Sequence, residues 1–240
     1  MCQVKANIIK AEFDVHANEY ENELNRWLNQ RFGTSKTYVN RAKAQELITL
    51  LKLNKDSNAL GKLLCLDVGC GTGAIASYLC QNNIKTIGVD LSYHMIQSGQ
   101  KCAPNQAQCI VSPSTRLPFE SGFFDCCYTV CLFHHLSEPD QIKTLREMKR
   151  VTKRGGLVTI FEHNPYNPVS QLIVKLSPLD KNVRLLTKSK VNQLFSETGI
   201  QTVLQKYILF FPEFMSKLNY LETYMNQWPM GCQYLVAGRA

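Results

Sequence analysis

Residues 66–76 read LDVGCGTGAIA, and this stretch decides the fold. The apolar run Lys62 to Val68 stops at Gly69, Gly71 and Gly73, as a buried parallel strand does on entering a tight turn. A helix-compatible stretch follows directly. Glycines admit positive φ and close backbone approach, and a helix start offers free N–H groups. The pattern predicts a strand–turn–helix unit that binds the negative or polar end of a ligand.

Two acidic residues beside this turn narrow the choice of ligand. The spacing of Gly69, Gly71 and Ala74 also fits a dinucleotide site, but that site presses phosphates against the glycines, and Asp67 would repel them. S-adenosylmethionine instead brings an ammonium and a sulfonium, which Asp67 attracts. Asp90 ends the next strand, TIGVD, where its carboxylate can accept both ribose hydroxyls. A glycine turn without a ligand is the alternative.

Four segments in order carry a family resemblance: LDVGCGTG (66–73), GVDLSYHM (88–95), LPFESGFFDCCYTVCLFHHL (117–136) and LREMKRVTKRGGLVTIFEH (145–163). Together they resemble the class I S-adenosylmethionine-dependent methyltransferases of the Rossmann-like superfamily, in the broad small-molecule group. The resemblance implies an α/β fold with a doubly wound, seven-stranded, mostly parallel sheet, one antiparallel strand, helices on both faces and an N-terminal helical cap. The part from EHNPYNPVSQLIVKLSPLD onward is similar to methyltransferases of bacterial sugar and polysaccharide pathways.

Length and composition favour one domain, because 240 residues at 45% hydrophobic content can bury one good core. We expect a helical cap over 1–60, a cofactor-binding core over 61–163, and acceptor-side loops, the last helix and a terminal strand hairpin over 164–240. The beginning of the chain has no signal-peptide pattern, and no apolar run reaches about eighteen residues. A cytoplasmic location is therefore expected.

The ten cysteines contain no Cys-x-x-Cys pair, and several lie in apolar strand-like runs, which predicts reduced core residues. A zinc set can be drawn from the cysteines and histidines of one segment, namely Cys126, Cys127, Cys131, His134 and His135. Adjacent strand residues point to opposite faces, which speaks against that set. We expect no metal.

The net charge of +8 is spread along the chain rather than gathered in one tract. It suits a phosphorylated, nucleotide-linked or anionic-lipid acceptor, and a merely solvated basic surface is the plain alternative. No dedicated nucleic-acid module accompanies the core. Peripheral membrane contact is compatible with the sequence but not required by it.

The resemblance also assigns cofactor contacts. Tyr20, in FDVHANEY, approaches the methionine moiety in relatives, although an aromatic at helical spacing is commonly a packing residue. Met95 faces the adenine edge. Relatives place an acidic residue before LPF to bind the adenine amino group, and Pro113 stands there, so adenine must rely on the backbone and hydroxyls nearby. The full expected set is Tyr20, Asp67, Gly69, Cys70, Gly71, Thr72, Gly73, Asp90, Leu91, Met95, Ser114, Thr115 and Cys131.

The acceptor should arrive where the fourth strand, residues 124–132, ends. Methyl transfer is an in-line displacement, and a base is needed only if the acceptor must lose a proton. Histidine titrates in the useful range. We rank His163 first and His134 second as base, with Glu162 as orienting group or alternative base. One of His134 and His135 is expected to be structural.

The later segments contribute the acceptor side. Asn164, Tyr166 and Asn167 can hydrogen-bond sugar hydroxyls, or the asparagines can form turn caps. Residues 203–211 and 232–238 are expected as the terminal strand hairpin. Between them, the apolar insertion 211–230 is a lid over a lipid or aromatic acceptor or, as we favour, part of the core.

The leading function is S-adenosylmethionine-dependent transfer of a methyl group to a small-molecule, sugar or lipid-linked acceptor, leaving S-adenosylhomocysteine. One alternative is a protein or RNA methyltransferase, which the positive charge permits. The other is a scaffold that binds the cofactor without catalysis, suggested by Pro113.

Overall fold

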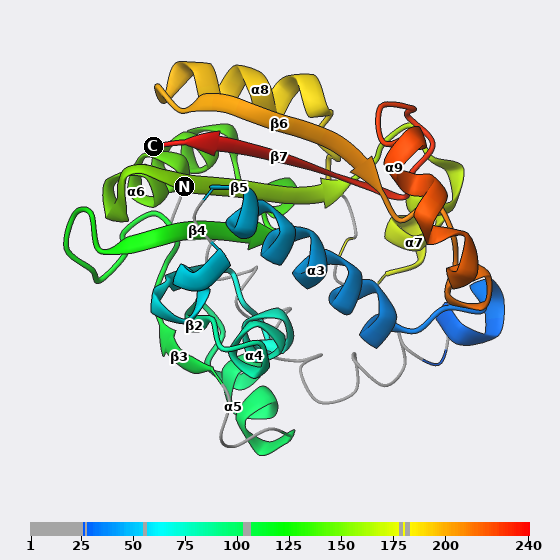
Figure 1. Ribbon diagram of the computed structural model, residues 1–240, viewed down its shortest axis with the longest axis horizontal. Helices are drawn as coiled ribbons and strands as arrows, with labels where there is room; N and C mark the ends of the chain where they lie inside the picture. The colour runs from blue at the N-terminus through cyan, green and yellow to red at the C-terminus, as the bar shows by residue number, and fades with distance from the viewer. Residues whose placement is uncertain (1–25, 27, 55–56, 103–106, 178–179, 181–182) are drawn as a thin grey trace.

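A seven-stranded sheet forms the centre of the protein in the computed structural model, which describes residues 26, 28–54, 57–102, 107–177, 180 and 183–240 (Figure 1). The strands are β1 (Leu64–Val68), β2 (Lys85–Asp90), β3 (Gln108–Val111), β4 (Phe124–Val130), β5 (Thr152–His163), β6 (Gln201–Ile208) and β7 (Gln233–Arg239). Their order is β3-β2-β1-β4-β5-β7-β6, and β7 runs antiparallel to both of its neighbours. The predicted α/β fold with one antiparallel strand is confirmed.

The central strands are those with unbroken apolar sequence. β4 is buried along almost its whole length and pairs with β1 and β5, whereas the short β3 at the edge is largely exposed. A strand covered on both faces needs apolar side chains on both, which explains the run FDCCYTV in β4. β5 begins at Thr152, because Thr152 already pairs with Phe124 across a register shift.

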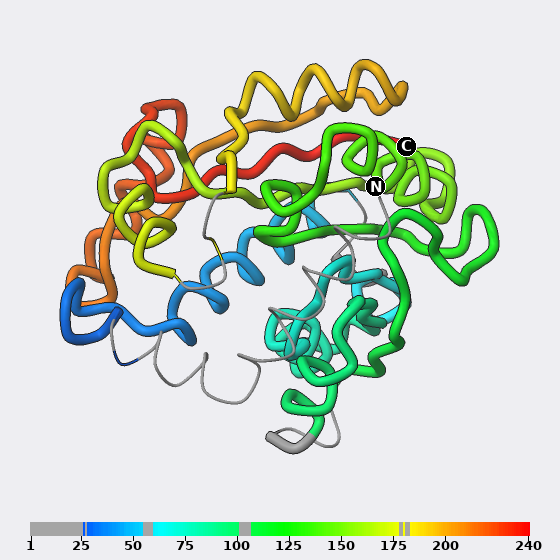
Figure 2. Tube along the Cα trace, turned by 180° about the vertical axis from the view of Figure 1, so that it is seen from behind, coloured from blue at the N-terminus to red at the C-terminus, as the bar shows by residue number. Residues whose placement is uncertain are grey.

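Helices cover both faces of the sheet. They are α3 (Lys36–Asn54), α4 (Ala74–Gln81), α5 (Tyr93–Cys102), α6 (Glu138–Val151), α7 (Pro168–Leu176), α8 (Lys188–Glu197) and α9 (Glu222–Met225), with shorter turns η1 (Ser57–Lys62), η2 (Phe133–His135) and η4 (Glu213–Leu221). The two opposite views place α3 on one side of β4 and β5 and place α6 and α8 on the other (Figures 1 and 2). The doubly wound arrangement follows from this placement.

Each face of the sheet has its own apolar core. Leu47 and Leu51 of α3 join the cluster that includes Tyr128 of β4, while Met148 of α6 and Phe195 of α8 join the cluster on the other face. The described part of the expected cap, α3, is thus a structural layer of the domain. Tyr20 lies outside the described residues.

The expectation of core packing for the insertion 211–230 is wrong. η4 and α9 contain no buried residue, and Phe214 and Tyr224 are 73% and 80% exposed. Tyr220, Trp228 and Met230 are exposed as well. Helical spacing of apolar residues predicts that they share a face, but it does not say whether another element covers that face. Here the described elements leave these side chains open.

No helix in the described ranges has the length and apolar character needed to cross a bilayer.

The contact between α5 and the glycine turn fixes the position of Met95. This contact depends on the absence of a side chain at Gly99. A Cβ added at Gly99 would lie 2.0 Å from the Thr72 carbonyl oxygen. We expect Gly99→Ala to lower the free energy of unfolding by about 1–3 kcal/mol, because backbone atoms cannot move aside as a flexible side chain can. Urea unfolding measures the effect.

Gly61→Ala is the matched control, since its added Cβ would find only the Asn83 carbonyl oxygen at 3.8 Å. It should change the free energy of unfolding by less than about 0.5 kcal/mol. Equal losses in the two variants would contradict the close contact at Gly99.

Candidate active site

A cavity of about 1400 Å³ lies where β1, β2, β4 and β5 end. Its walls come from the residues that follow each strand and from α3, α7 and the segment 209–212. In an open α/β sheet the carboxyl ends of parallel strands meet at one edge, and ligands bind in the crevice there. The cavity therefore occupies the position at which the fold builds its ligand site.

The glycine turn forms one wall. Gly69, Gly71 and Gly73 have φ values of 75°, 53° and 72°, which side chains rarely adopt. A Cβ added at Gly69 would lie 2.9 Å from Leu132, so this position also needs glycine for space. Gly69 and Gly71 line the cavity, whereas Gly73 precedes α4 as its N-cap and is not among the lining residues.

Two carboxylates stand beside this turn, as the sequence predicts. The Asp90 carboxylate accepts hydrogen bonds from the backbone N–H of Gly71 at 2.7 Å and of Ser92 at 2.8 Å, which fixes its orientation. Asp67 is 2% exposed. Burial raises the pKa of Asp67 to about 8, and the negative charge of Asp90 adds to the effect. A cationic ligand group next to Asp67 would relieve this cost.

These features fit S-adenosylmethionine. The glycine turn with a buried acid suits an ammonium group, and an oriented carboxylate at the end of β2 suits the two ribose hydroxyls. Other residues expected at the cofactor line the same cavity, namely Cys70, Thr72, Leu91, Met95, Ser114, Thr115 and Cys131. Ser114 Oγ lies 3.0 Å from Thr144 Oγ1, so its hydroxyl already has a partner in the fold.

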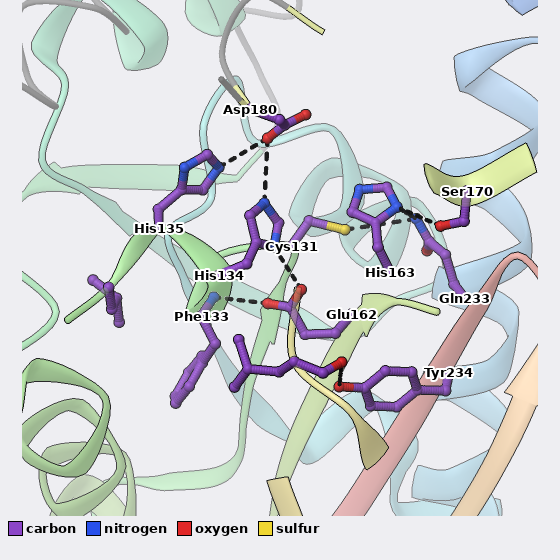
Figure 3. A network of polar contacts seen from close by, with 12 residues as sticks. Cys131, Phe133, His134, His135, Glu162, His163, Ser170, Asp180, Gln233 and Tyr234 are labelled. Carbon is purple, nitrogen blue, oxygen red and sulfur yellow. Dashed lines mark hydrogen bonds and ion pairs between the residues drawn. The ribbon is translucent and has the colours of Figure 1, made fainter. Parts of the chain in front are cut away.

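An ion network lies along another wall of the cavity (Figure 3). Glu162, at 0% exposure, accepts a hydrogen bond from the Phe133 N–H at 2.7 Å and contacts His134 Nδ1 at 2.6 Å. The other ring nitrogen of His134 lies 3.3 Å from Asp180, which is also 3.2 Å from His135 Nε2. His134 thus bridges two carboxylates.

The charges of this network decide the protonation of its members. Burial alone would lower the pKa of His134, but Glu162 and Asp180 raise it well above its usual value. Burial alone would raise the pKa of Glu162, and the charge of His134 instead lowers it. At neutral pH, His134 is therefore an imidazolium that its two carboxylate partners stabilise.

His163 and His135 lie on opposite sides of His134 (Figure 3). The ring centroid of His134 is 5.6 Å from that of His163 and 4.2 Å from that of His135. Its Nδ1 is 3.4 Å from both Gln233 Nε2 and Ser170 Oγ. An amide nitrogen donates, so Nδ1 accepts and the proton of the neutral ring sits on Nε2. Burial, with the positive charge of His134, lowers the pKa of His163 to about 4.

The residues proposed for sugar hydroxyls have other partners. Asn164 is 0% exposed and does not line the cavity, because its Nδ2 donates to the carbonyl oxygens of Pro229 and Gly231. Tyr166 is 62% exposed and also lies outside the lining. Asn167 lines the cavity while its Oδ1 caps α7 by accepting from the Ser170 N–H at 2.9 Å. The turn-cap alternative describes both asparagines.

Nothing in the sequence singled out two residues of the site. Asp180 belongs to the ion network together with His135, and Lys43 of α3 lies 4.0 Å from Cys131 Sγ inside the cavity wall. Asp180 follows the segment LIVKLSPL, and no recognisable motif in the sequence marks it. Lys43 sits in a helix whose pattern shows only that it packs on the sheet. For both, the partner is distant in sequence.

The described cysteines are all free thiols, in agreement with the expectation of reduced residues. In the part of the chain that the structure describes, one group could supply a metal with three ligands. His134, His135 and Asp180 place their ligand atoms within 4.8 Å of one another. The proposed zinc set of Cys126 and Cys127 with these histidines is not among such groups.

Comparison with known proteins assigns the core. Residues 66–160 match the methyltransferase domain family. The chain is 33% identical over 116 residues to a tRNA (carboxymethyluridine(34)-5-O)-methyltransferase of Arabidopsis thaliana. The aligned segment covers 48% of this chain and 27% of that protein. It is 31% identical over 131 residues to a demethylmenaquinone methyltransferase of Staphylococcus saprophyticus, covering 52% of the chain and 55% of that protein. The chain thus spans about half or less of these relatives.

A solved structure supports the same fold. Magnesium protoporphyrin IX methyltransferase of Synechocystis, with S-adenosylhomocysteine bound, superimposes with a TM-score of 0.65 at 15% identity, covering 98% of this chain and 100% of that one. The sheet order, the glycine turn with Asp67 and Asp90, and the matched domain agree with one another. Residues 66–160 thus belong to the methyltransferase domain family, and the chain has the fold of the class I S-adenosylmethionine-dependent methyltransferases.

Proposed function

We propose that the protein transfers the methyl group of S-adenosylmethionine to a small acceptor with an apolar body, by in-line displacement. The observation that supports this is the continuity of the cavity. It holds the glycine turn, Asp67 and Asp90 at one end, and its other walls include Phe32, Val39, Ile173, Leu209 and Phe210. A largely apolar enclosure excludes water and suits a small molecule or a lipid-linked group better than a folded macromolecule.

Residues Asp67, Gly69, Gly71 and Asp90 would hold the cofactor. When bound, it supplies an electrophilic methyl group on a positively charged sulfur. The chain then has to orient the acceptor, exclude water and manage any proton. Positive charge on the ligand suits Asp67 because the carboxylate form becomes favourable beside it. No metal is needed for this assignment, since the carboxylates of the ion network already hydrogen-bond to His134.

The histidines suit positioning rather than proton removal. His134 is already protonated by its carboxylate partners, and His163, the first-ranked base, has a pKa near 4, which makes it a weak proton acceptor at neutral pH. Glu162 orients His134 rather than His163. We infer that Glu162 and His134 shape the acceptor wall and that His163 donates a hydrogen bond there.

RNA is the second candidate acceptor class. A relative acts, by its name, on carboxymethyluridine in tRNA, and the net charge of +8 would favour a polyanion. The two classes separate in one assay, because bulk tRNA should accept label from radioactive S-adenosylmethionine only if RNA is the substrate. A scaffold without catalysis would transfer label to no acceptor.

Calorimetric titration tests the cofactor assignment. S-adenosylmethionine and S-adenosylhomocysteine should bind, and NAD should not, because its phosphates bring no cation to the buried Asp67 carboxyl. Asp90→Ala should weaken binding by about 1.5–3 kcal/mol, the usual value for hydrogen bonds to a charged group. Binding of NAD, or unchanged affinity in Asp90→Ala, would overturn the assignment of these residues.

A proton should leave Asp67 when the cofactor binds. With a pKa of about 8 in the free protein, the carboxyl is mostly protonated at neutral pH, and a bound ammonium favours its ionised form. Titration at about pH 6.5 in buffers of different ionisation enthalpy should therefore report release of about one proton per molecule bound. In Asp67→Asn the release should vanish. Equal proton release in both proteins would show that another group titrates.

The pair of Glu162 and His134 should leave a pH signature in stability. The folded-state pKa of His134 lies above 6.5. Its contribution to stability is therefore full below pH 6.5 and falls as the pH rises through the folded-state pKa. The folded-state pKa of Glu162 lies below 4.5, so its contribution is full above that pH and is lost as pH falls. Glu162→Gln should lower the free energy of unfolding by about 3–5 kcal/mol between these two pH limits and by less outside them.

Glu120→Gln, at an exposed position, serves as the control and should show no such window. Chemical unfolding at several pH values measures both variants. If Glu162→Gln lowered the free energy of unfolding by the same amount from acid to alkaline pH, the assignment of Glu162 and His134 as a charged pair would be wrong.

A further inference from the structure

Lys43 is a buried ammonium for which the described part of the chain supplies no counter-ion. It is 5% exposed, lies on the inner face of α3 and lines the cavity. Its Nζ has Cys131 Sγ as hydrogen-bond partner, at 4.0 Å, and no described carboxylate forms an ion pair with it. Buried lysines are rare unless they are paired, because an isolated buried charge is costly. A ligand that enters the cavity is the natural source of the missing negative charge.

The neighbourhood of Lys43 offers donors. The positive charge of Lys43 contributes to the lowered pKa of His163, so the two groups share one corner with Cys131 (Figure 3 shows Cys131, His163 and Gln233 together). With Nδ1 of His163 occupied by Gln233 and Ser170, the ring presents an N–H at Nε2. An ammonium and a neutral N–H together can receive the two oxygens of a carboxylate.

Among the described residues of this corner, Cys131, His163 and His134 are poorly suited to take a proton. Burial raises the pKa of the Cys131 thiol and lowers that of His163, so the first holds its proton and the second resists gaining one. His134 carries its proton between Glu162 and Asp180, and His135 contacts Asp180 on the far side of His134 (Figure 3). An acceptor already ionised at neutral pH needs no base, and a carboxylic acid meets that condition.

We propose that the acceptor is an apolar carboxylic acid that binds as its carboxylate against Lys43 and His163 and is methylated on that carboxylate. The proposal rests on the proposed methyl transfer and names its substrate class. The apolar body of the acid lies along Val39, Leu209 and Phe210 in the same cavity.

The step balances without proton transfer. A lone pair of one carboxylate oxygen forms the new bond to the methyl carbon, and the bond from that carbon to sulfur breaks with its electron pair going to sulfur. The products are a neutral methyl ester and a neutral thioether. Because the ester no longer neutralises Lys43, its ion pair is lost, which favours release of the product.

Labelling with S-adenosylmethionine radioactive in the methyl group tests the proposal. The probes are benzoate, 4-phenylbutyrate and decanoate with their primary amides, and the fraction of a bacterial extract that passes a small-molecule filter. Mild base converts methyl esters to volatile methanol but leaves ethers, amines and C-methyl products intact. We expect volatile label from acids, none from amides, and a loss of at least about tenfold in kcat/KM for Lys43→Met.

Controls separate charge from packing. Lys43→Arg keeps the cation and should retain most of the activity, and Lys52→Met, on the exposed end of the same helix, should match the wild type. With S-adenosylhomocysteine bound, decanoate should raise the Tm of the wild type more than decanamide does, and Lys43→Met should abolish the difference. Since Lys43→Met removes an unpaired buried charge, its Tm without probe should equal or exceed that of the wild type.

Three results would overturn the proposal. Label found only in base-stable products would show methyl transfer to another kind of atom and leave the proposed function standing. Volatile label at equal rates in wild type and Lys43→Met would remove Lys43 from acceptor binding. No label in any fraction, with cofactor binding intact, would count against methyl transfer itself and with it against this substrate class.

Discussion

The buried contact of Glu162 with His134 organises the cavity wall that follows β4 and β5. One carboxylate oxygen accepts from the Phe133 backbone and the other from the His134 ring, so the end of β5 holds the turn that follows β4. A carboxylate in this position needs a cation, and His134 becomes that cation because Asp180 approaches its other nitrogen. Burial, together with the charge on His134, keeps His163 neutral. One ion pair thus sets the geometry of a loop and the protonation of His134, and it contributes to that of His163.

The cavity is electrically asymmetric. One end carries Asp67 and Asp90, and the corner proposed for the acceptor carries Lys43 beside neutral donors. Opposite charges at the two ends favour a cation at one and an anion at the other, which is the arrangement required when an anionic nucleophile meets a sulfonium. Deep burial strengthens both preferences, because water cannot screen them.

Local sequence was enough for the fold and for the positions of the glycine turn, Asp67 and Asp90. The apolar run of β1, the glycines after it and Asp90 at the end of β2 lie within one strand–helix–strand unit, so their spacing predicts their placement. Helix caps at Ser92, Ser137 and Thr187 likewise act within a single turn of chain. The insertion 211–230 shows where such reasoning ends. Its periodicity predicted a shared apolar face, yet η4 and α9 leave that face exposed, since coverage depends on elements elsewhere in the chain.

The sequence by itself determined the sheet, the glycine turn and the two carboxylates of the cofactor site, because each depends on residues close together in the chain. Only the tertiary structure decided which histidine is charged, that Asp180 completes the network and that Lys43 enters the cavity. Lys43 and Cys131 are 88 positions apart, and His134 and Asp180 are 46 apart. The protonation of a side chain depends on burial and on neighbouring charges in space, and the packing of α3, α7 and the strand ends supplies both.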